Sequence, residues 1–482
     1  MPSTKTKIIF TIGPATMDPE VLRRLLRAGV DLCRINMAHV KAEDVAGIVA
    51  LVRTAAAAED RQLATLMDIK GPEIRTGELV EPLSLQVGDP LDLAVDEEAA
   101  ARPSVPLVPV NYPGLIHDLG EGSTVLVDNG LLRFRVEGKD AGRLCCRVEI
   151  GGLLESRRHI NLPGTHVRLP ALTEKDEVDV QAGVAAGVDY FAQSFVRQPE
   201  DVDALRRLLA RSQSSARIIA KIEDQQAIRN LDDIIRASDA LMVARGDLGI
   251  EIPYEDLPLL QHRAVQTCIR LQKPVIVATH MLESMIDNPV PTRAEVSDVA
   301  LAVGQRTDGI MLSGETAVGK YPEECVQVFK RISEATEALH DPDTRHGLVL
   351  RNPKSKLVRS ASGLAEDIGD ACVIVFTKAG NLPQLLSSLR PHRTPVFAFT
   401  DRPEVARQMQ LLWGVEPFEI PFARKREATI RTAFTRLLEK NRVREGNWAV
   451  VITTVLRRQR LIEGVQLRRV EAPGEAEGEE NP

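Results

Sequence analysis

Short apolar segments alternate with longer segments of helical periodicity along most of this chain. The apolar segments are KIIFTIG (7–13), LCRINM (32–37), LATLMD (63–68), DYFAQSFV (189–196), RIIAKIE (217–223), ALMVARG (240–246), PVIVATH (274–280) and GIMLSG (309–314). This alternation is typical of βα units whose strands are parallel. Eight such units predict an α/β fold, a (β/α)₈ TIM barrel whose active site lies at the carboxyl ends of the strands.

The βα pattern is interrupted once, after the third apolar segment. Beyond LATLMDIKGPEIRTG (63–77) the chain changes to short alternating strands and tight turns, with a hairpin signal at Asp128-Asn129-Gly130. Helical periodicity returns at ALTEKDEVDVQAG (171–183), and another α/β pattern begins near residue 345. An insert rooted at the active-site face of a barrel is well placed to act as a lid.

These changes in pattern predict the domain organisation. We expect a barrel domain in two parts (1–72 and 169–343), an inserted all-β lid domain that forms a β-barrel (73–168), a C-terminal α/β domain (344–470) and a disordered acidic tail (471–482).

Composition excludes several classes of partner and compartment. A net charge of −7, a pI near 5.9 and 4% aromatic residues argue against nucleic-acid binding. No apolar run approaches the roughly 18 residues that span a bilayer, so no membrane association is expected. The N-terminus shows no signal peptide and the six cysteines fit neither a disulfide framework nor a zinc site, so we expect reduced thiols and a cytoplasmic protein.

Polar side chains stand at or just beyond the carboxyl end of seven of the eight predicted strands. In chain order they are Arg34 and Asn36, Asp68 and Lys70, Ser194 and Arg197, Lys221 and Glu223, Arg245 and Asp247, Thr279 and Glu283, and Ser313 and Glu315. One such end indicates only a solvated strand terminus or a structural ion pair. Seven on one rim indicate an active site, and strand alternation places Lys221 and Glu223 on the face that lines the barrel mouth.

The residue types on this rim indicate an anionic substrate and a divalent metal. Glu223 and Asp247 follow neighbouring strands and are the oxygen ligands that Mg²⁺ prefers. Arg34, Lys221 and Arg245 supply positive charge for a phosphate or carboxylate. Phosphoryl transfer needs little beyond such positioning and charge neutralisation, and no Ser-His-Asp or Cys-His arrangement competes for the role.

Two other signals are discounted. GETAVGKY (314–321) nearly matches a P-loop, but Tyr321 replaces the small hydroxyl that binds Mg²⁺, and Pro322 follows it. The nine histidines lack metal spacing, and only His39 is expected near the rim.

The chain resembles pyruvate kinases over almost its whole length. The motifs that carry the resemblance are TKIIFTIGPAT, RINMAH, MDIKGPEIRTG, INLPG, AKIED, MVARGDLGIEIP, ATHMLESM, PTRAEVSDVA and IMLSGETAVGKYP. The resemblance implies that the protein transfers the phosphoryl group of phosphoenolpyruvate to ADP, giving pyruvate and ATP in the last step of glycolysis. It also suggests a homotetramer.

The resemblance also implies roles for individual residues. Catalytic roles carry over to Lys221, Arg34, Thr279, Glu283 and Ser313. Substrate contacts carry over to Arg34, Ser194, Lys221, Gly246, Asp247 and Thr279, and nucleotide contacts to Asn36, His39, Arg75 and Arg158. Glu223 and Asp247 match the ligands of Mg²⁺ (or Mn²⁺), while Asn36, Asp68 and the carbonyl of Ile69 match those of K⁺.

Departures from the family pattern affect the K⁺ site and regulation. Ala38 stands where the family places a serine in its K⁺ site, whereas Glu73 is the residue type of K⁺-dependent members, so the two signals conflict. In the C-terminal region, the loop TKAGNLP (377–383) has Ala379, Leu382 and Pro383 at positions where many members that bind an effector phosphate have small hydroxyl or compact residues. No allosteric effector is therefore carried over.

Two other classes of function stay open at this point. One is a metabolite-sensing or scaffold paralogue that has lost turnover, suggested by Ala38 and the altered loops. The other is a different barrel enzyme, an aldolase or lyase acting on a 2-oxo acid or its enol phosphate. Retention of Lys221, Glu223 and Asp247 weighs against the first, and a lid that shields a phosphoryl intermediate weighs against the second.

Overall fold

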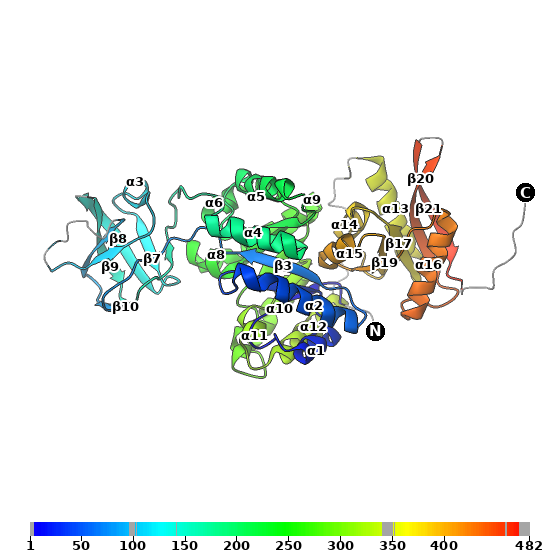
Figure 1. Cartoon of the computed structure of the whole chain (residues 1–482), viewed down its shortest axis with the longest axis horizontal. Coiled ribbons are helices and arrows are strands. Elements are labelled where there is room, and N and C mark those ends of the chain that lie inside the picture. The colour runs from blue at the N-terminus through cyan, green and yellow to red at the C-terminus, as the bar shows by residue number, and fades with distance from the viewer. Residues whose placement is uncertain are drawn as a thin grey trace, which may run out of the picture.

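The computed structural model describes residues 4–95, 102, 104–140, 142–339, 350, 352–457 and 460–471. Figure 1 shows three regions in a row, with a central barrel, a β-rich insert at one end and a C-terminal α/β region at the other. The expected acidic tail falls almost entirely outside the described residues, as does the expected boundary at 343/344. The other domain boundaries stay predictions.

The central region is a closed barrel of eight parallel strands in the order β1-β16-β15-β14-β13-β12-β3-β2, which confirms the predicted fold. The strands are β1 (Lys7–Thr11), β2 (Leu32–Asn36), β3 (Ala64–Ile69), β12 (Tyr190–Gln193), β13 (Arg217–Ile222), β14 (Ala240–Ala244), β15 (Val275–Ala278) and β16 (Gly309–Met311). Seven lie within one of the eight apolar segments of the sequence, and β3 extends one residue beyond its segment, to Ile69.

Helices connect these strands and cover the barrel. They are α1 (Pro19–Ala28), α2 (Val45–Ala58), α4 (Glu174–Ala186), α5 (Pro199–Arg211), α6 (Gln225–Arg229), α7 (Leu231–Ala237), α8 (Arg245–Glu251), α9 (Leu257–Leu271), α10 (Arg293–Gly304), α11 (Gly314–Ala317) and α12 (Pro322–Leu339). Local sequence fixes their ends: at α1, the Asp18 side chain accepts from the backbone N–H groups of Glu20 and Val21, and Gly29 ends the helix in the left-handed conformation.

Two apolar layers hold the barrel together. Side chains facing outward pack against the helices, and those facing inward form a separate buried cluster that includes Ile219 and Met242. Because side chains of a strand alternate, Lys221 shares the inward face with Ile219 and lies one step nearer the mouth. Among the described residues, no helix combines the length and apolar character needed to cross a membrane.

The insert lies between β3 and α4, as predicted. Its sheet has the order β11-β7-β8-β9-β5-β6, and a separate ribbon pairs β10 with β4. The elements are β4 (Leu83–Leu85), β5 (Pro90–Ala94), β6 (Leu107–Pro109), a short α3 (Leu115–Asp118), β7 (Thr124–Val127), β8 (Leu132–Asp140), β9 (Arg143–Ile150), β10 (Gly152–Leu154) and β11 (Ile160–Asn161). The hairpin signal is confirmed, because Asp128 and Asn129 join β7 to β8 with φ of 53° and 57°. Closure of this sheet into a barrel stays a prediction.

The C-terminal region is a five-stranded sheet of order β19-β18-β17-β20-β21 with helices packed on it. Its elements are α13 (Pro353–Ile368), β17 (Ala371–Phe376), α14 (Asn381–Ser388), β18 (Val396–Thr400), α15 (Pro403–Gln408), β19 (Val415–Glu419), α16 (Arg426–Glu439), β20 (Trp448–Arg457) and β21 (Arg460–Arg469). The sequence indicated β17, β18 and β20, but not the edge strands β19 and β21.

A buried ion pair joins the barrel to the C-terminal region. The Arg390 guanidinium donates to both carboxylate oxygens of Asp308, at 2.9 and 2.6 Å, and both side chains are 2% exposed. Asp308 precedes β16 and also accepts from the backbone N–H groups of Val275 and Trp413. Removing one partner of such a pair leaves an uncompensated buried charge.

We therefore expect Arg390→Met to lower the free energy of unfolding by about 3–5 kcal/mol, the usual cost of breaking a buried pair. The matched control is Arg24→Met, because Arg24 pairs with Glu323 on the surface, where the two side chains are 49% and 34% exposed. The control is expected to change stability by less than about 1 kcal/mol. Urea unfolding of both variants measures this, and equal small changes would contradict the role assigned to Arg390.

Candidate active site

A buried ammonium group occupies the centre of the barrel mouth. The Lys221 Nζ lies 2.8 Å from Glu223 Oε1 and 3.2 Å from Asp68 Oδ1, and it donates to Ser194 Oγ at 2.6 Å. These partners come from the ends of three adjacent strands, β3, β12 and β13, so barrel closure brings together residues far apart in sequence. The Lys221 side chain is 11% exposed, which leaves a small part of it facing the mouth.

Arg34 extends this cluster to β2. Its guanidinium binds Asp68 Oδ2 through Nε at 2.8 Å and Nη2 at 2.6 Å, and Nη1 donates to Thr11 Oγ1 at 3.2 Å. Asp68 thus joins two cations, one on each side. The bidentate contact fixes the plane of the guanidinium.

The electrostatics of the cluster follow from its burial. Burial by itself lowers the pKa of Lys221, but the carboxylates of Asp68 and Glu223 outweigh it and raise that pKa above its usual range. Burial raises the pKa of Asp68, yet Lys221 and Arg34 outweigh this and leave it lowered. For Glu223 burial dominates and raises the pKa to about 7, with Asp247 adding to the effect and Lys221 opposing it. Lys221 therefore stays protonated at neutral pH.

The two predicted Mg²⁺ ligands lie on neighbouring strand ends. The Glu223 carboxylate is held in place by Lys221 Nζ and by the backbone N–H of Phe195, which donates to Oε2 at 2.6 Å. Asp247 lies in the first turn of α8. No group of three or more His, Cys, Asp or Glu side chains within the described part of the chain is arranged to hold a metal ion. Two mutually repelling carboxylates suit a cation that takes its other ligands from water and substrate.

Thr279 lies next to these carboxylates in a strained backbone conformation. Its φ is 70°, unusual for a β-branched residue, and its Oγ1 accepts from the backbone N–H of Gly246 at 2.6 Å. Arg245, expected to bind an anion, is instead 7% exposed and bound to Asp298 at 2.7 Å and to the Thr279 carbonyl at 2.8 Å. The Arg245 guanidinium is therefore occupied by protein partners, and it holds the backbone of Thr279 in place.

The predicted nucleotide-binding residues lie around the rim. Arg75 stands where the chain enters the insert and pairs with Glu73, and Arg158 on the insert pairs with Asp128. His39 is exposed beside a surface pocket of about 480 Å³. Asn36 ends β2 and pairs in register with Asp68.

Within the described part of the chain, no hydrogen bond joins Glu283 to Ser313. The Glu283 side chain is 62% exposed, and its carboxylate lies 3.8 Å from His280 Nε2. The Ser313 hydroxyl is buried and has no hydrogen-bond partner among the described residues.

The segment that resembles a P-loop begins at Gly314, the first residue of α11. Its lysine, Lys320, forms an ion pair with Asp287 on the surface.

Comparisons with known proteins agree with this geometry. The family model described as "Pyruvate kinase, barrel domain" matches residues 3–326, and the model for its alpha/beta domain matches residues 355–460. The chain belongs to the pyruvate kinase family. It is 39% identical to a pyruvate kinase of Geobacillus stearothermophilus over 94% of this chain and 78% of the relative. It is 38% identical to the chloroplastic pyruvate kinase isozyme G of Nicotiana tabacum, over 97% of this chain and 84% of the relative.

A solved structure shows the same arrangement of domains. The crystal structure of a pyruvate kinase from Cryptosporidium parvum matches with a TM-score of 0.92 and 33% identity, covering 97% of this chain and 96% of that chain. The protein is a phosphotransferase that converts phosphoenolpyruvate and ADP to pyruvate and ATP. The scaffold and the aldolase or lyase alternatives have no support among these relatives.

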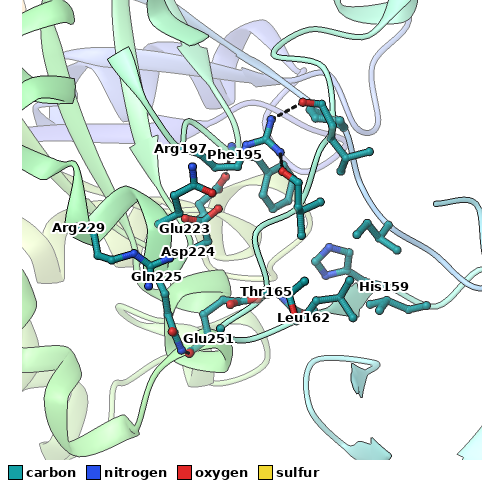
Figure 2. A pocket seen from close by; sticks show the side chains of 18 residues that line it. His159, Leu162, Thr165, Phe195, Arg197, Glu223, Asp224, Gln225, Arg229 and Glu251 are labelled. Carbon is teal, nitrogen blue, oxygen red and sulfur yellow. Dashed lines mark hydrogen bonds between the residues drawn. The ribbon is translucent and has the colours of Figure 1, made fainter. Parts of the chain in front are cut away.

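The sequence missed two contacts between the insert and the barrel. His159 was expected away from the rim, but it lies in the cavity between insert and barrel shown in Figure 2, with its ring 6.0 Å from that of Phe195. Burial lowers the pKa of His159, and Asp247 opposes that shift. Asn161 donates to Glu251 Oε1 at 3.0 Å, and burial raises the pKa of Glu251 to about 7. Local pattern could not show either, because both depend on where the insert docks.

Proposed function

We propose that Lys221 is the side chain that stabilises the phosphoryl group as it moves from phosphoenolpyruvate to ADP. The observation that supports this is a protonated ammonium, held by three oxygen partners, at the centre of the barrel mouth. A charge that is already oriented costs no reorganisation when negative charge develops on the phosphoryl oxygens. Arg34, fixed by Asp68 and Thr11, adds a second oriented cation for the substrate phosphate, and Ser194 accepts from Lys221.

Glu223 and Asp247 are the proposed ligands of Mg²⁺ or Mn²⁺. A bound divalent ion would neutralise phosphate oxygens as charge develops on them. The charge balance supports this proposal. Arg34 and Lys221 are offset by Asp68 and Glu223, and Asp247 adds a negative charge, so these five side chains alone offer no net attraction to a polyanion.

The substrate carboxylate is proposed to bind at Gly246, Asp247 and Thr279. The Gly246 N–H now donates to the Thr279 hydroxyl at 2.6 Å, and that hydroxyl donates to the Ala278 carbonyl at 2.6 Å. An incoming carboxylate would accept from the Gly246 N–H and from the Thr279 hydroxyl in place of these two bonds. We assign Glu283 and Ser313 to the proton relay that protonates the enolate. The buried, unpartnered hydroxyl of Ser313 is the feature that supports its part.

The nucleotide is proposed to bind along Asn36, His39, Arg75 and Arg158. The pocket beside His39 supports a place for the base and ribose, and the two arginines supply charge for the phosphates. Members of this family generally need both Mg²⁺ and K⁺. A homotetramer and a cytoplasmic location stay predictions.

The first test is Lys221→Met, assayed with phosphoenolpyruvate, ADP and Mg²⁺ by coupling pyruvate formation to a dehydrogenase. We expect kcat to fall on the order of 10²- to 10³-fold, because one oriented charge of the transition state is lost. The control is Lys273→Met, since Lys273 donates to the Ser238 carbonyl at the opposite end of the barrel. A Lys221→Met rate within a few-fold of the parent would exclude the proposed role.

The metal site is tested with Glu223→Gln and Asp247→Asn. Each change removes one negative ligand from a cation with few protein ligands, so the dissociation constant for Mn²⁺ should rise by about tenfold or more. Electron spin resonance of free Mn²⁺ measures this without reference to activity. Glu177→Gln, on the exposed face of α4, serves as the control. Unchanged Mn²⁺ affinity in both site variants would place the metal elsewhere.

The K⁺ site is proposed to be present but weakened. Asn36, Asp68 and the carbonyl of Ile69 would hold the ion, but each oxygen already accepts a hydrogen bond, and Ala38 adds no side-chain oxygen. Glu73, the residue type of K⁺-dependent members, pairs with Lys70 and Arg75.

We therefore expect K⁺ to activate at a higher concentration than in relatives with the serine. Ala38→Ser should lower the K⁺ concentration for half-maximal activity several-fold, about the effect of one added neutral oxygen ligand. Titration with KCl against a tetramethylammonium chloride background measures this. Full parent activity without K⁺ or Na⁺ would show that this chain does not use the ion.

A further inference from the structure

The loop after β12, residues 194–197, contacts both segments that connect the barrel to the insert. On the outgoing segment, the Ser194 hydroxyl donates to the Ile69 carbonyl at 2.8 Å. Gly71 packs so closely that a Cβ there would lie 3.1 Å from Ser194 Cβ, and its φ of 71° also favours glycine. The returning segment is held by Arg197.

The Arg197 guanidinium makes hydrogen bonds to that returning segment, and its Nε also lies 3.8 Å from the buried Asp201 Oδ2. Its Nη1 donates to the Val167 carbonyl at 3.1 Å, and its Nη2 to the carbonyls of Leu169 at 2.7 Å and Pro170 at 3.5 Å. Figure 2 shows Arg197 at the edge of the cavity, with dashed lines marking its hydrogen bonds to the segment that returns from the insert. The residue is 7% exposed, so its fork is not available to substrate.

The loop does not need this guanidinium for its own shape. The backbone N–H of Arg197 donates to Asp201 Oδ2 at 2.9 Å, and its carbonyl accepts from Asn230 Nδ2 at 2.8 Å. These backbone contacts would survive replacement of the side chain. The hydrogen bonds of the guanidinium therefore go to the connection to the insert, while Asp201 and Asn230 hold the loop backbone. Among the described residues, the ion pair with Asp201 is the one polar contact of the guanidinium within its own βα unit.

The same loop orients the proposed catalytic groups. The N–H of Phe195 binds Glu223, and the Ser194 hydroxyl accepts from Lys221. The returning segment to the insert is thus fixed to the element that also fixes the proposed metal ligand and the catalytic ammonium. A cavity of about 60 Å³ borders the segment, so packing alone does not hold it there.

We propose that Arg197 is a positioning residue that sets the angle of the insert over the barrel mouth, so that Arg158 on the insert reaches the nucleotide phosphates. The inference rests on the proposed function for its kinetic consequence. The geometric part of the inference, that Arg197 orients the insert, does not depend on the proposed function.

Kinetics of Arg197→Met and Arg197→Lys test the consequence. A misplaced insert should raise KM for ADP about fivefold or more and lower kcat about tenfold to 100-fold, because small displacements of a positioning group have effects of that size. The Mn²⁺ dissociation constant should stay within about twofold, since Glu223 is still held by the loop. Arg197→Lys, which keeps the charge and can reach one carbonyl, should recover part of the loss.

A distance measurement tests the geometry directly. Spin labels at Leu153→Cys on β10 and Val178→Cys on α4 occupy exposed positions, 58% and 56% exposed, in a background where the partly exposed Cys145 is replaced by alanine. We expect Arg197→Met to give a broader or shifted distance distribution than the parent measured with the same ligands. If the methionine variant fails to fold, Arg197→Lys carries the measurement.

Arg206→Met is the matched control for both experiments. Arg206 also lies in this βα unit and donates to a backbone carbonyl, that of Ala237, but it does not contact the insert. Its kinetics and distances should match the parent.

Several results would overturn the inference: parent-like distances in Arg197→Met, the same changes in Arg206→Met, or a loss of Mn²⁺ affinity as large as the loss of kcat. An inactive parent would refute the proposed function instead, and the distance arm would still decide the role of Arg197.

Discussion

The burial of one ammonium group, that of Lys221, constrains the rest of the site. An isolated ion that is taken out of water costs several kcal/mol, so a buried lysine requires fixed oxygen partners. Here Asp68, Ser194 and Glu223 provide them from three strand ends. The contacts form only when the barrel closes in this register, so the buried charge and the fold are specified together.

That arrangement also accounts for a divalent ion, which members of this family generally need. The cluster is close to neutral before any ligand arrives, because its two cations are already paired with two carboxylates. A substrate with several negative charges gains little from such a cluster unless a further positive charge accompanies it. Burial is the main cause of the raised pKa of Glu223, and the carboxylate of Asp247 adds to it, so a cation held by both carboxylates would relieve their repulsion.

Most of the barrel and its rim could be predicted from sequence because strand geometry is local. Alternation along β13 places Lys221 on the inward face with Ile219, and parallel strands bring their carboxyl ends to one rim. Pairing between side chains is not local. Asp68 was assigned to K⁺, yet in the structure it joins Arg34 to Lys221, and Arg245 holds Thr279 instead of facing the substrate. His159 depends on how the insert docks, which no short segment encodes. The strands β19 and β21 were missed because edge strands rich in charged residues carry a weak apolar signal.

Two strained loop residues, Phe195 and Thr279, make contacts on which the proposed site depends. Phe195 and Thr279 have φ of 54° and 70°, a conformation that costs on the order of 1–3 kcal/mol for a bulky or β-branched residue. Each strained residue makes one contact to the site, Phe195 to Glu223 and Thr279 to Gly246. Such conformations persist only where the surroundings determine them, and here the buried bonds of Arg245 to the Thr279 carbonyl and of Asp201 to the loop backbone do so. The rigid barrel therefore acts as the reference against which both strained loops, and through Arg197 the insert, are held.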